Sequence, residues 1–153
     1  MQPFVVAGAG FLLAVLWFDL MFDVQVLRHR GPGDLPEPVL ASIAGYYRRV
    51  TTEARPMNRL IAAVMLVVIA ALVAQALVDD VPGWVSAVSL AAALTGIGLA
   101  GARTVPGAVR LGGRGDPPGE QSRLARSICR EHLVCLAAIA TLLVVQLAWA
   151  PSG

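Results

Sequence analysis

Two carboxylates lie one helical turn apart inside an apolar stretch of the chain. Asp19 and Asp23 belong to the segment WFDLMFDVQ, residues 17–25, and a spacing of four residues places both on the same face of a helix. Two ionised carboxylates at this spacing repel each other, so either one of them holds a proton or a cation lies between them. Acids arranged in this way can exchange protons, hold a cation or pair with arginine.

The composition places these acids in a membrane protein. Of the 153 residues, 57% are hydrophobic and the mean hydropathy is +0.70, whereas soluble domains are roughly 45–50% apolar. All basic residues are arginines, which fits a GC-rich bacterial coding bias and therefore a bacterial inner membrane. The arginines are dispersed among apolar segments, and no basic run with interleaved aromatic residues is present, so nucleic acid is excluded as a partner.

The apolar runs predict an all-α fold, a polytopic membrane protein built as a four-transmembrane-helix antiparallel bundle. Each run is long enough to cross roughly 30 Å of hydrocarbon. We interpret residues 1–153 as a single transmembrane domain, and the short DDVPG turn at residues 79–83 makes its second and third helices antiparallel neighbours. The predicted helices span about 3–27, 60–78, 81–102 and 133–150, and the connections span about 28–59 and 103–132.

The arginines indicate the orientation. They gather in or beside the two long connections, which the positive-inside rule assigns to the cytoplasm. Both termini then lie outside the cytoplasm. The arginines that carry this prediction are Arg28, Arg30, Arg48, Arg49, Arg55 and Arg59 in the first connection, and Arg103, Arg110, Arg114, Arg123, Arg126 and Arg130 in the second.

The first connection predicts a cytoplasmic interfacial amphipathic helix. In the segment VLASIAGYYRRVTTEARP the apolar residues repeat at helical spacing and the charged residues take the other side. Such a helix could lie on the inner leaflet, or it could dock its apolar face against the bundle or a partner helix. The second connection has a glycine- and proline-rich loop at residues 104–120, followed by an arginine-bearing helix. The residues expected to contact anionic lipid headgroups are Tyr46, Tyr47, Arg48, Arg49, Arg123 and Arg126.

A polar cluster in the inner-leaflet half of the bundle is the main candidate site. Counted from Arg28, Asp23 lies about 7 Å and Asp19 about 13 Å deeper along the helix axis. A charge at such depth costs about 2.5–3.5 kcal/mol, so it faces the bundle interior and pairs with another group. We predict a cluster of Asp19, Asp23, Arg59, Arg103, Arg130 and His132, to which Asn58 and Glu131 add hydrogen bonds.

Metal ligation is not predicted, although carboxylates, His132, Cys129 and Cys135 supply suitable atoms. One helix cannot surround a tetrahedral ion, and the chain has only two histidines. The two cysteines cannot form a disulfide on one helix, because six residues of rise separate them by about 9 Å. We therefore interpret them as small apolar residues of the core. The sequence does not indicate which cofactor, if any, the protein binds.

Two classes of function remain open. The first is a non-catalytic membrane subunit, accessory protein or scaffold, in a homo-oligomer or a larger membrane complex, in which the buried acids fix the register of the helices. The second is a membrane-embedded enzyme or proton-coupled transporter for a lipophilic substrate. In that class Asp19 or Asp23 accepts a proton and His132 assists, which makes these three the candidate catalytic residues.

Overall fold

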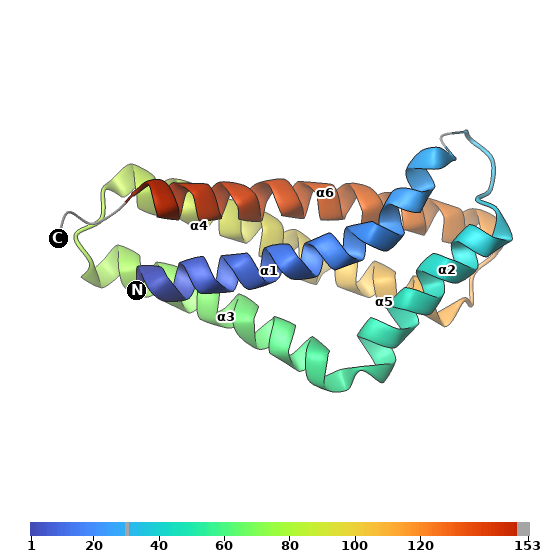
Figure 1. Ribbon diagram of the computed structural model, residues 1–153, viewed down its shortest axis with the longest axis horizontal. Coiled ribbons are helices and arrows are strands. Elements are labelled where there is room, and N and C mark those ends of the chain that lie inside the picture. Colours follow the sequence, from blue (N-terminus) through green and yellow to red (C-terminus); the bar gives the residue numbers. More distant parts are fainter. Residues whose placement is uncertain (30, 150–153) are drawn as a thin grey trace.

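The computed structural model describes residues 1–29 and 31–149, which form helices and no strand (Figure 1). Arg30, which belongs to the orientation prediction, and residue 150, the predicted end of the fourth helix, lie outside these ranges. In chain order the elements are α1 (Gln2–Asp23), the 3-10 turn η1 (Val24–Arg28), α2 (Glu37–Arg48), the π turn η2 (Arg49–Glu53), α3 (Arg55–Val78), α4 (Gly83–Leu99), the π turn η3 (Ala100–Thr104), α5 (Val105–Gly113) and α6 (Pro118–Ala148).

Four helical segments are long and apolar enough to cross a membrane, as predicted, and they are compatible with a multi-pass membrane protein. They are Gln2–Arg28, Pro56–Val78, Gly83–Gly113 and Pro118–Ala148. In Figure 1 they run along the length of the molecule, with the N-terminus and the end of α6 at the same side of the picture. α6 packs against α1 and α4, and α3 packs against α1 and α4.

The third of these segments is longer than predicted. We expected a loop over residues 104–120, but the chain stays helical to Gly113. Pro106 falls in the first turn of α5, where its missing N–H is tolerated, and the π turn η3 directly precedes this helix. The helix is then stabilised by packing, because Ala108 and Leu111 are buried.

α2 docks its apolar face on the rest of the molecule. Leu40, Ile43 and Tyr47 of α2 share an apolar core with Leu111 and Ile128, and α2 contacts both α5 and α6. These contacts agree with the docking alternative for this helix. They also fix which way its tyrosine side chains point.

α2 and α5 approach each other most closely at Gly112. A Cβ atom built on Gly112 would lie 2.7 Å from the backbone nitrogen of Arg48 and 3.2 Å from the carbonyl carbon of Tyr47. Glycine is therefore required here for the two helices to pack at this distance.

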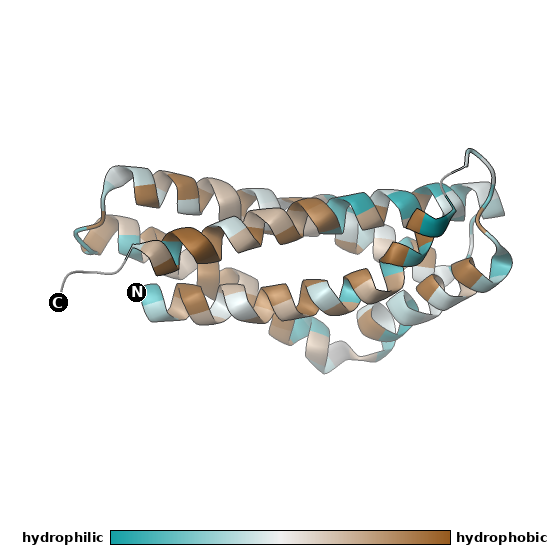
Figure 2. Cartoon of the chain, turned by 45° about the horizontal axis from the view of Figure 1, so that its top comes forward, coloured by the Kyte–Doolittle hydropathy of each residue, from teal (hydrophilic) through white to brown (hydrophobic). Residues whose placement is uncertain are grey.

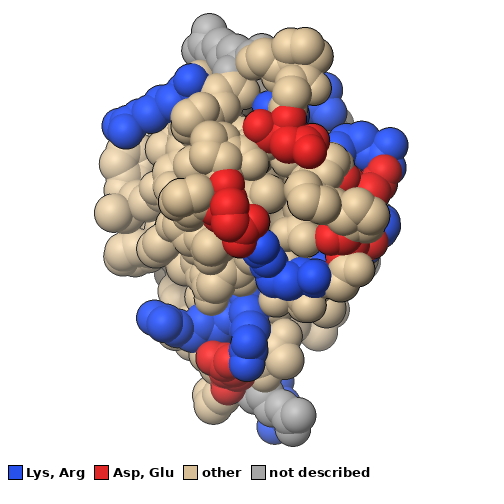
Figure 3. Space-filling view, turned by 90° about the vertical axis from the view of Figure 1, so that its right-hand side faces the viewer, with Lys and Arg blue, Asp and Glu red and all other residues tan. Residues whose placement is uncertain are grey.

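Charged residues gather at the end of the molecule that holds α2. Figure 2 shows this end as the more hydrophilic one, and Figure 3 views it directly, with arginines and acids interspersed. Several of them form ion pairs with exposed partners, each of which contributes little to stability. These pairs are Arg48–Glu53, Arg110–Asp116, Arg114–Glu37 and Arg123–Glu120.

The opposite end contains a buried network of neutral side chains, which we call the glutamine cluster: Gln2, Gln75, Ser89 and Gln146. Gln75 donates to Gln146 Oε1 at 3.2 Å, and Gln146 donates to Ser89 Oγ at 2.9 Å. Gln2 donates to the carbonyl oxygen of Trp149 at 2.7 Å. This network ties α1, α3, α4 and α6 together without any charge.

Candidate functional site

Asp23 lies at the centre of a buried hydrogen-bonded triad formed by α1, α2 and α6. Its carboxylate is fully enclosed and accepts two hydrogen bonds. The Tyr47 hydroxyl donates to Oδ1 at 2.6 Å, and His132 Nδ1 lies 2.6 Å from Oδ2. Because an ionised carboxylate can only accept, the imidazole donates to it from Nδ1–H.

Asp19 occupies the next helical turn and faces the other nitrogen of the same imidazole. Asp19 Oδ2 lies 3.6 Å from His132 Nε2, and the Tyr46 hydroxyl donates to Asp19 Oδ1 at 2.7 Å. The ring of Phe22 stacks on Tyr46 with centroids 4.1 Å apart. The side chain between the two carboxylates is therefore an imidazole, and we call Asp19, Asp23, Tyr46, Tyr47 and His132 the acid–histidine cluster.

The two tyrosines belong to this cluster, which the sequence analysis missed. Tyr47 is only 2% exposed, so the prediction that it contacts lipid headgroups is wrong, and the Tyr46 hydroxyl is bound to a carboxylate. Burial, together with the neighbouring acids, raises the pKa of Tyr46 and Tyr47, so both stay protonated and act as donors. The signal available in the sequence was their place on the apolar face of a helix.

The predicted arginines lie outside the cluster. Arg103 pairs with Glu131 at 3.5 Å, and among the side chains that the structure describes no guanidinium forms an ion pair with Asp19 or Asp23. Arg59 and Arg130 are exposed. For Arg130 the reason is helical phase, because two residues along α6 rotate a side chain by about 200°, so Arg130 and His132 cannot face the same acids.

The remaining predicted residues make separate contacts. Asn58 donates to the carbonyl oxygen of Thr51. Glu131 accepts hydrogen bonds from Thr104 and Ser127, each at 3.0 Å. Arg126 donates to the carbonyl oxygens of His29 and Gly33, while Arg48 and Arg123 form the exposed ion pairs described above and Arg49 is exposed. Headgroup contact by these four arginines stays a prediction.

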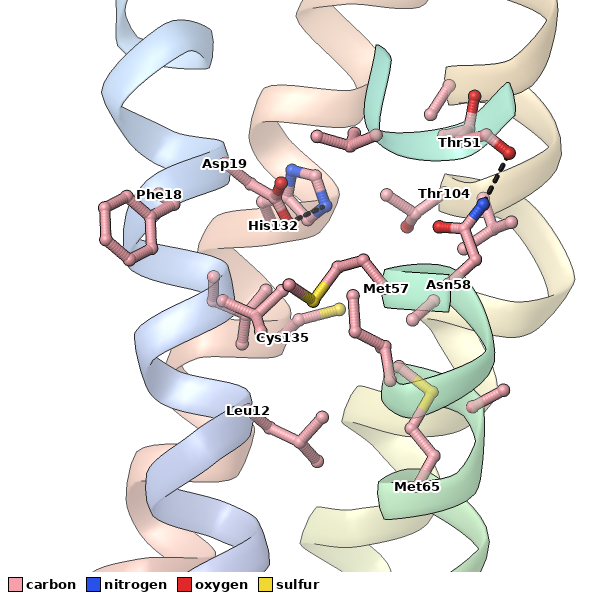
Figure 4. Close-up of a pocket in the computed structure, with 18 of the residues that line it drawn as sticks. Leu12, Phe18, Asp19, Thr51, Met57, Asn58, Met65, Thr104, His132 and Cys135 are labelled. Atoms are coloured by element: carbon pink, nitrogen blue, oxygen red, sulfur yellow. Dashed lines mark hydrogen bonds and ion pairs between the residues drawn. The ribbon is translucent and has the colours of Figure 1, made fainter. Parts of the chain in front are cut away.

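A cavity of about 560 Å³ lies beside the cluster and between the helices. Asp19 and His132 contribute to its wall, and most of the other lining residues are apolar. Figure 4 shows Met57 of α3 extending toward α1, with Asp19 and His132 above it and Leu12 below. A molecule in this space would meet an apolar wall and one polar end, the usual composition of a binding site for a small organic ligand.

Both π turns contribute to the cavity wall. Val50 and Thr51 come from η2, and Ala100 and Thr104 come from η3. Such turns re-aim side chains within a helix and are frequent at functional sites.

Among the described residues, no group of three or more His, Cys, Asp or Glu side chains is arranged to hold a metal ion. The cysteines are buried and free, and the Cys135 thiol donates to the carbonyl oxygen of Gly96 at 3.3 Å. The acid–histidine cluster contains carboxylate, imidazole and phenol groups, which are able to bind and transfer protons.

Comparison of the chain with protein-family models, with curated proteins and with solved structures finds no match.

Proposed function

We propose that this multi-pass membrane protein takes a lipophilic molecule into the cavity and exchanges a proton with it at the acid–histidine cluster. The observation that carries the proposal is the position of Asp19 and His132 in the wall of a largely apolar cavity of about 560 Å³. An ionisable pair in a membrane span is costly unless it is used or paired. Here the pair also faces a space that a ligand can fill.

The roles follow from the hydrogen bonds. Asp23 is buried and orients the imidazole through Nδ1, as a carboxylate does for a catalytic histidine, and Tyr47 donates to the other oxygen of Asp23. His132 Nε2 is then the atom that accepts or returns a proton, with Asp19 beside it. The same pair serves an enzyme that performs acid–base chemistry or a transporter that couples substrate to a proton.

For the membrane arrangement we propose a single-domain antiparallel bundle in a bacterial inner membrane. The arginines of the α2 end support a cytoplasmic position for that end, with α2 at the interface and both termini outside the cytoplasm. Anionic headgroups are then its lipid partners.

A non-catalytic subunit or scaffold, alone as a homo-oligomer or in a larger membrane complex, is the second candidate. Asp23 favours it, because a fully enclosed acid with both oxygens bonded can fix the register of α1, α2 and α6 without meeting a ligand. This role needs no ligand in the cavity.

Binding of an uncharged lipophilic probe separates the two candidates. We would titrate 4-octylanisole into the protein in mild detergent and follow adducts by native mass spectrometry, in the wild type, Ala62→Phe and Ala63→Phe. Ala62 lines the cavity and Ala63, also exposed, does not. We expect one stoichiometric adduct in the wild type and in Ala63→Phe, and its loss in Ala62→Phe. If all three proteins form the same amount of adduct, or if none forms an adduct, the non-catalytic role is the remaining candidate.

A further inference from the structure

We infer that the molecule held in the cavity is a neutral lipophile whose polar head is an aromatic hydroxyl, of the phenol or hydroquinone class. The inference rests on the proposed function and adds the chemical class of the ligand. It depends on the atoms that the cavity presents at its polar end and on the charges that it lacks.

The first observation is an imidazole nitrogen without a hydrogen bond. His132 Nδ1 is engaged by Asp23, whereas Nε2 has only the carboxylate of Asp19 at 3.6 Å, which is longer than a hydrogen bond. In the neutral ring with its proton on Nδ1, Nε2 carries a lone pair and can accept. A hydroxyl group satisfies this nitrogen by donating to it, and an ether or a ketone cannot.

The second observation is the charge of the cavity wall. Among the described residues that line it, the acid–base groups besides the phenols are Asp19, His132 and the Cys135 thiol, and none is an arginine. A phosphate or carboxylate head would meet the Asp19 carboxylate without a guanidinium to balance the repulsion. The site therefore selects against anionic lipids, although arginines are plentiful at the same end of the molecule.

The third observation concerns the entrance of the cavity and the methionine side chains in its wall. Met57, Val105 and Val109 line the cavity and are 46%, 49% and 47% exposed, so its mouth is apolar. A neutral head can pass such a mouth, whereas an ammonium head would have to leave water without a partner. Met57 extends into the space in Figure 4 and Met65 also lines it, and thioethers pack favourably on aromatic rings. An aromatic hydroxyl is also acidic enough to share its proton with an imidazole.

The test compares probes that differ only in the head group. We would measure the affinities of 4-octylphenol, 4-octylanisole and 4-octylbenzoate by calorimetry, for the protein in phosphatidylcholine nanodiscs. The wild type should bind the phenol about tenfold more tightly than the anisole, the size expected for one buried hydrogen bond, and should bind the benzoate most weakly. His132→Leu should remove the preference for the phenol. His29→Leu, at the other histidine of the chain, should keep it, because His29 is not among the cavity-lining residues.

The outcomes separate the inference from the proposed function. Equal binding of phenol and anisole, tighter binding of benzoate, or an unchanged preference in His132→Leu would overturn the hydroxyl inference and leave the cavity as a lipophile site. If none of the three probes binds, the inference and the proposed function both fail. If His132→Leu does not fold, the ratio of phenol to anisole affinity in the wild type decides the matter alone.

Discussion

The two buried polar clusters of this molecule differ in chemistry and in surroundings. The glutamine cluster is composed of amides and a hydroxyl, and its members bond to one another or to backbone carbonyl oxygens. The acid–histidine cluster at the α2 end contains two carboxylates, an imidazole and two phenols. Some residues of the acid–histidine cluster line the cavity of about 560 Å³, whereas no residue of the glutamine cluster lines it.

The contrast separates two uses of polarity within apolar spans. Neutral amide pairs are enough to tie helices together, at a modest gain for each bond. Ionisable groups add a cost of burial that helix association does not require. Four of the five residues of the acid–histidine cluster, all but Asp23, line the cavity, and this supports the proton chemistry proposed for the α2 end.

The largest difference that we expect between the two clusters is in their response to alkaline pH. Both tyrosines of the chain belong to the acid–histidine cluster, and their pKa values are raised by burial and by the adjacent acids. A raised pKa of the folded state gives stability that is complete below the ordinary tyrosine pKa of about 10 and is lost as the pH rises above it. Tyrosinate absorbance should therefore stay absent in the folded protein above pH 10 and appear only with unfolding. Ionisation near pH 10 without loss of helix would contradict the burial of these phenols.

The next largest effect should come from Asp23→Ala. This change leaves the Tyr47 hydroxyl and His132 Nδ1 without their buried acceptor. We expect the free energy of unfolding in detergent to fall by about 3–5 kcal/mol, as for other buried pairs that lose one partner. Asp23→Asn is the matched control, because its amide oxygen still accepts from Tyr47 and its amide nitrogen can donate to the other imidazole tautomer. A loss no greater for Asp23→Ala than for Asp23→Asn would show that the triad does not stabilise the fold.

Gly112→Ala tests whether α2 must lie against α5 for the cluster to form. The added methyl group would lie 2.7 Å from the backbone nitrogen of Arg48, so α2 has to move and Tyr47 moves with it. Overpacking of this kind costs about 1–3 kcal/mol. The control is Gly113→Ala, where a Cβ meets nothing within 4 Å. Unfolding measurements on both variants should show a loss only for Gly112→Ala, and equal stabilities would mean that α2 is not tightly docked.

The sequence predicts the helices, but it does not predict which side chains meet between them. The four long apolar helices follow from composition and length, and so does the need of Asp19 and Asp23 for a partner. The choice of His132 over Arg130 depends on the rotation of α6 about its axis. Residues 130 and 132 lie at almost the same depth, so depth alone could not decide between them.

The tyrosines show a second limit, because α2 is amphipathic and two surfaces could cover its apolar face. Lipid headgroups and the α5–α6 surface both accept tyrosine rings, and the sequence does not rank them. Gly112 decides between these two surfaces, because it lets α5 come close enough to bury Tyr47. That contact joins residues far apart in the chain, and no local pattern reveals it.

The smallest effect should come from the glutamine cluster. Gln146→Leu leaves Gln75 Nε2 and Ser89 Oγ without the partner that each has now. Interhelical hydrogen bonds of this type contribute about 1–2 kcal/mol in a membrane at most, so we expect a loss of that size in the free energy of unfolding. Thr141→Val is the control on the same helix, because its exposed hydroxyl bonds only to the carbonyl oxygen of Ala137, and it should change stability by less than about 0.5 kcal/mol.

Gln146→Leu should also leave the binding of 4-octylphenol unchanged, because no residue of the glutamine cluster lines the cavity. Calorimetry on the variant reads this directly. Weaker binding in Gln146→Leu, with the helix content intact, would mean that the two ends of the bundle are energetically coupled. It would then be wrong to separate a glutamine cluster that only holds the helices together from a proton site at the α2 end. The geometry of the α2 end would depend on hydrogen bonds at the opposite end.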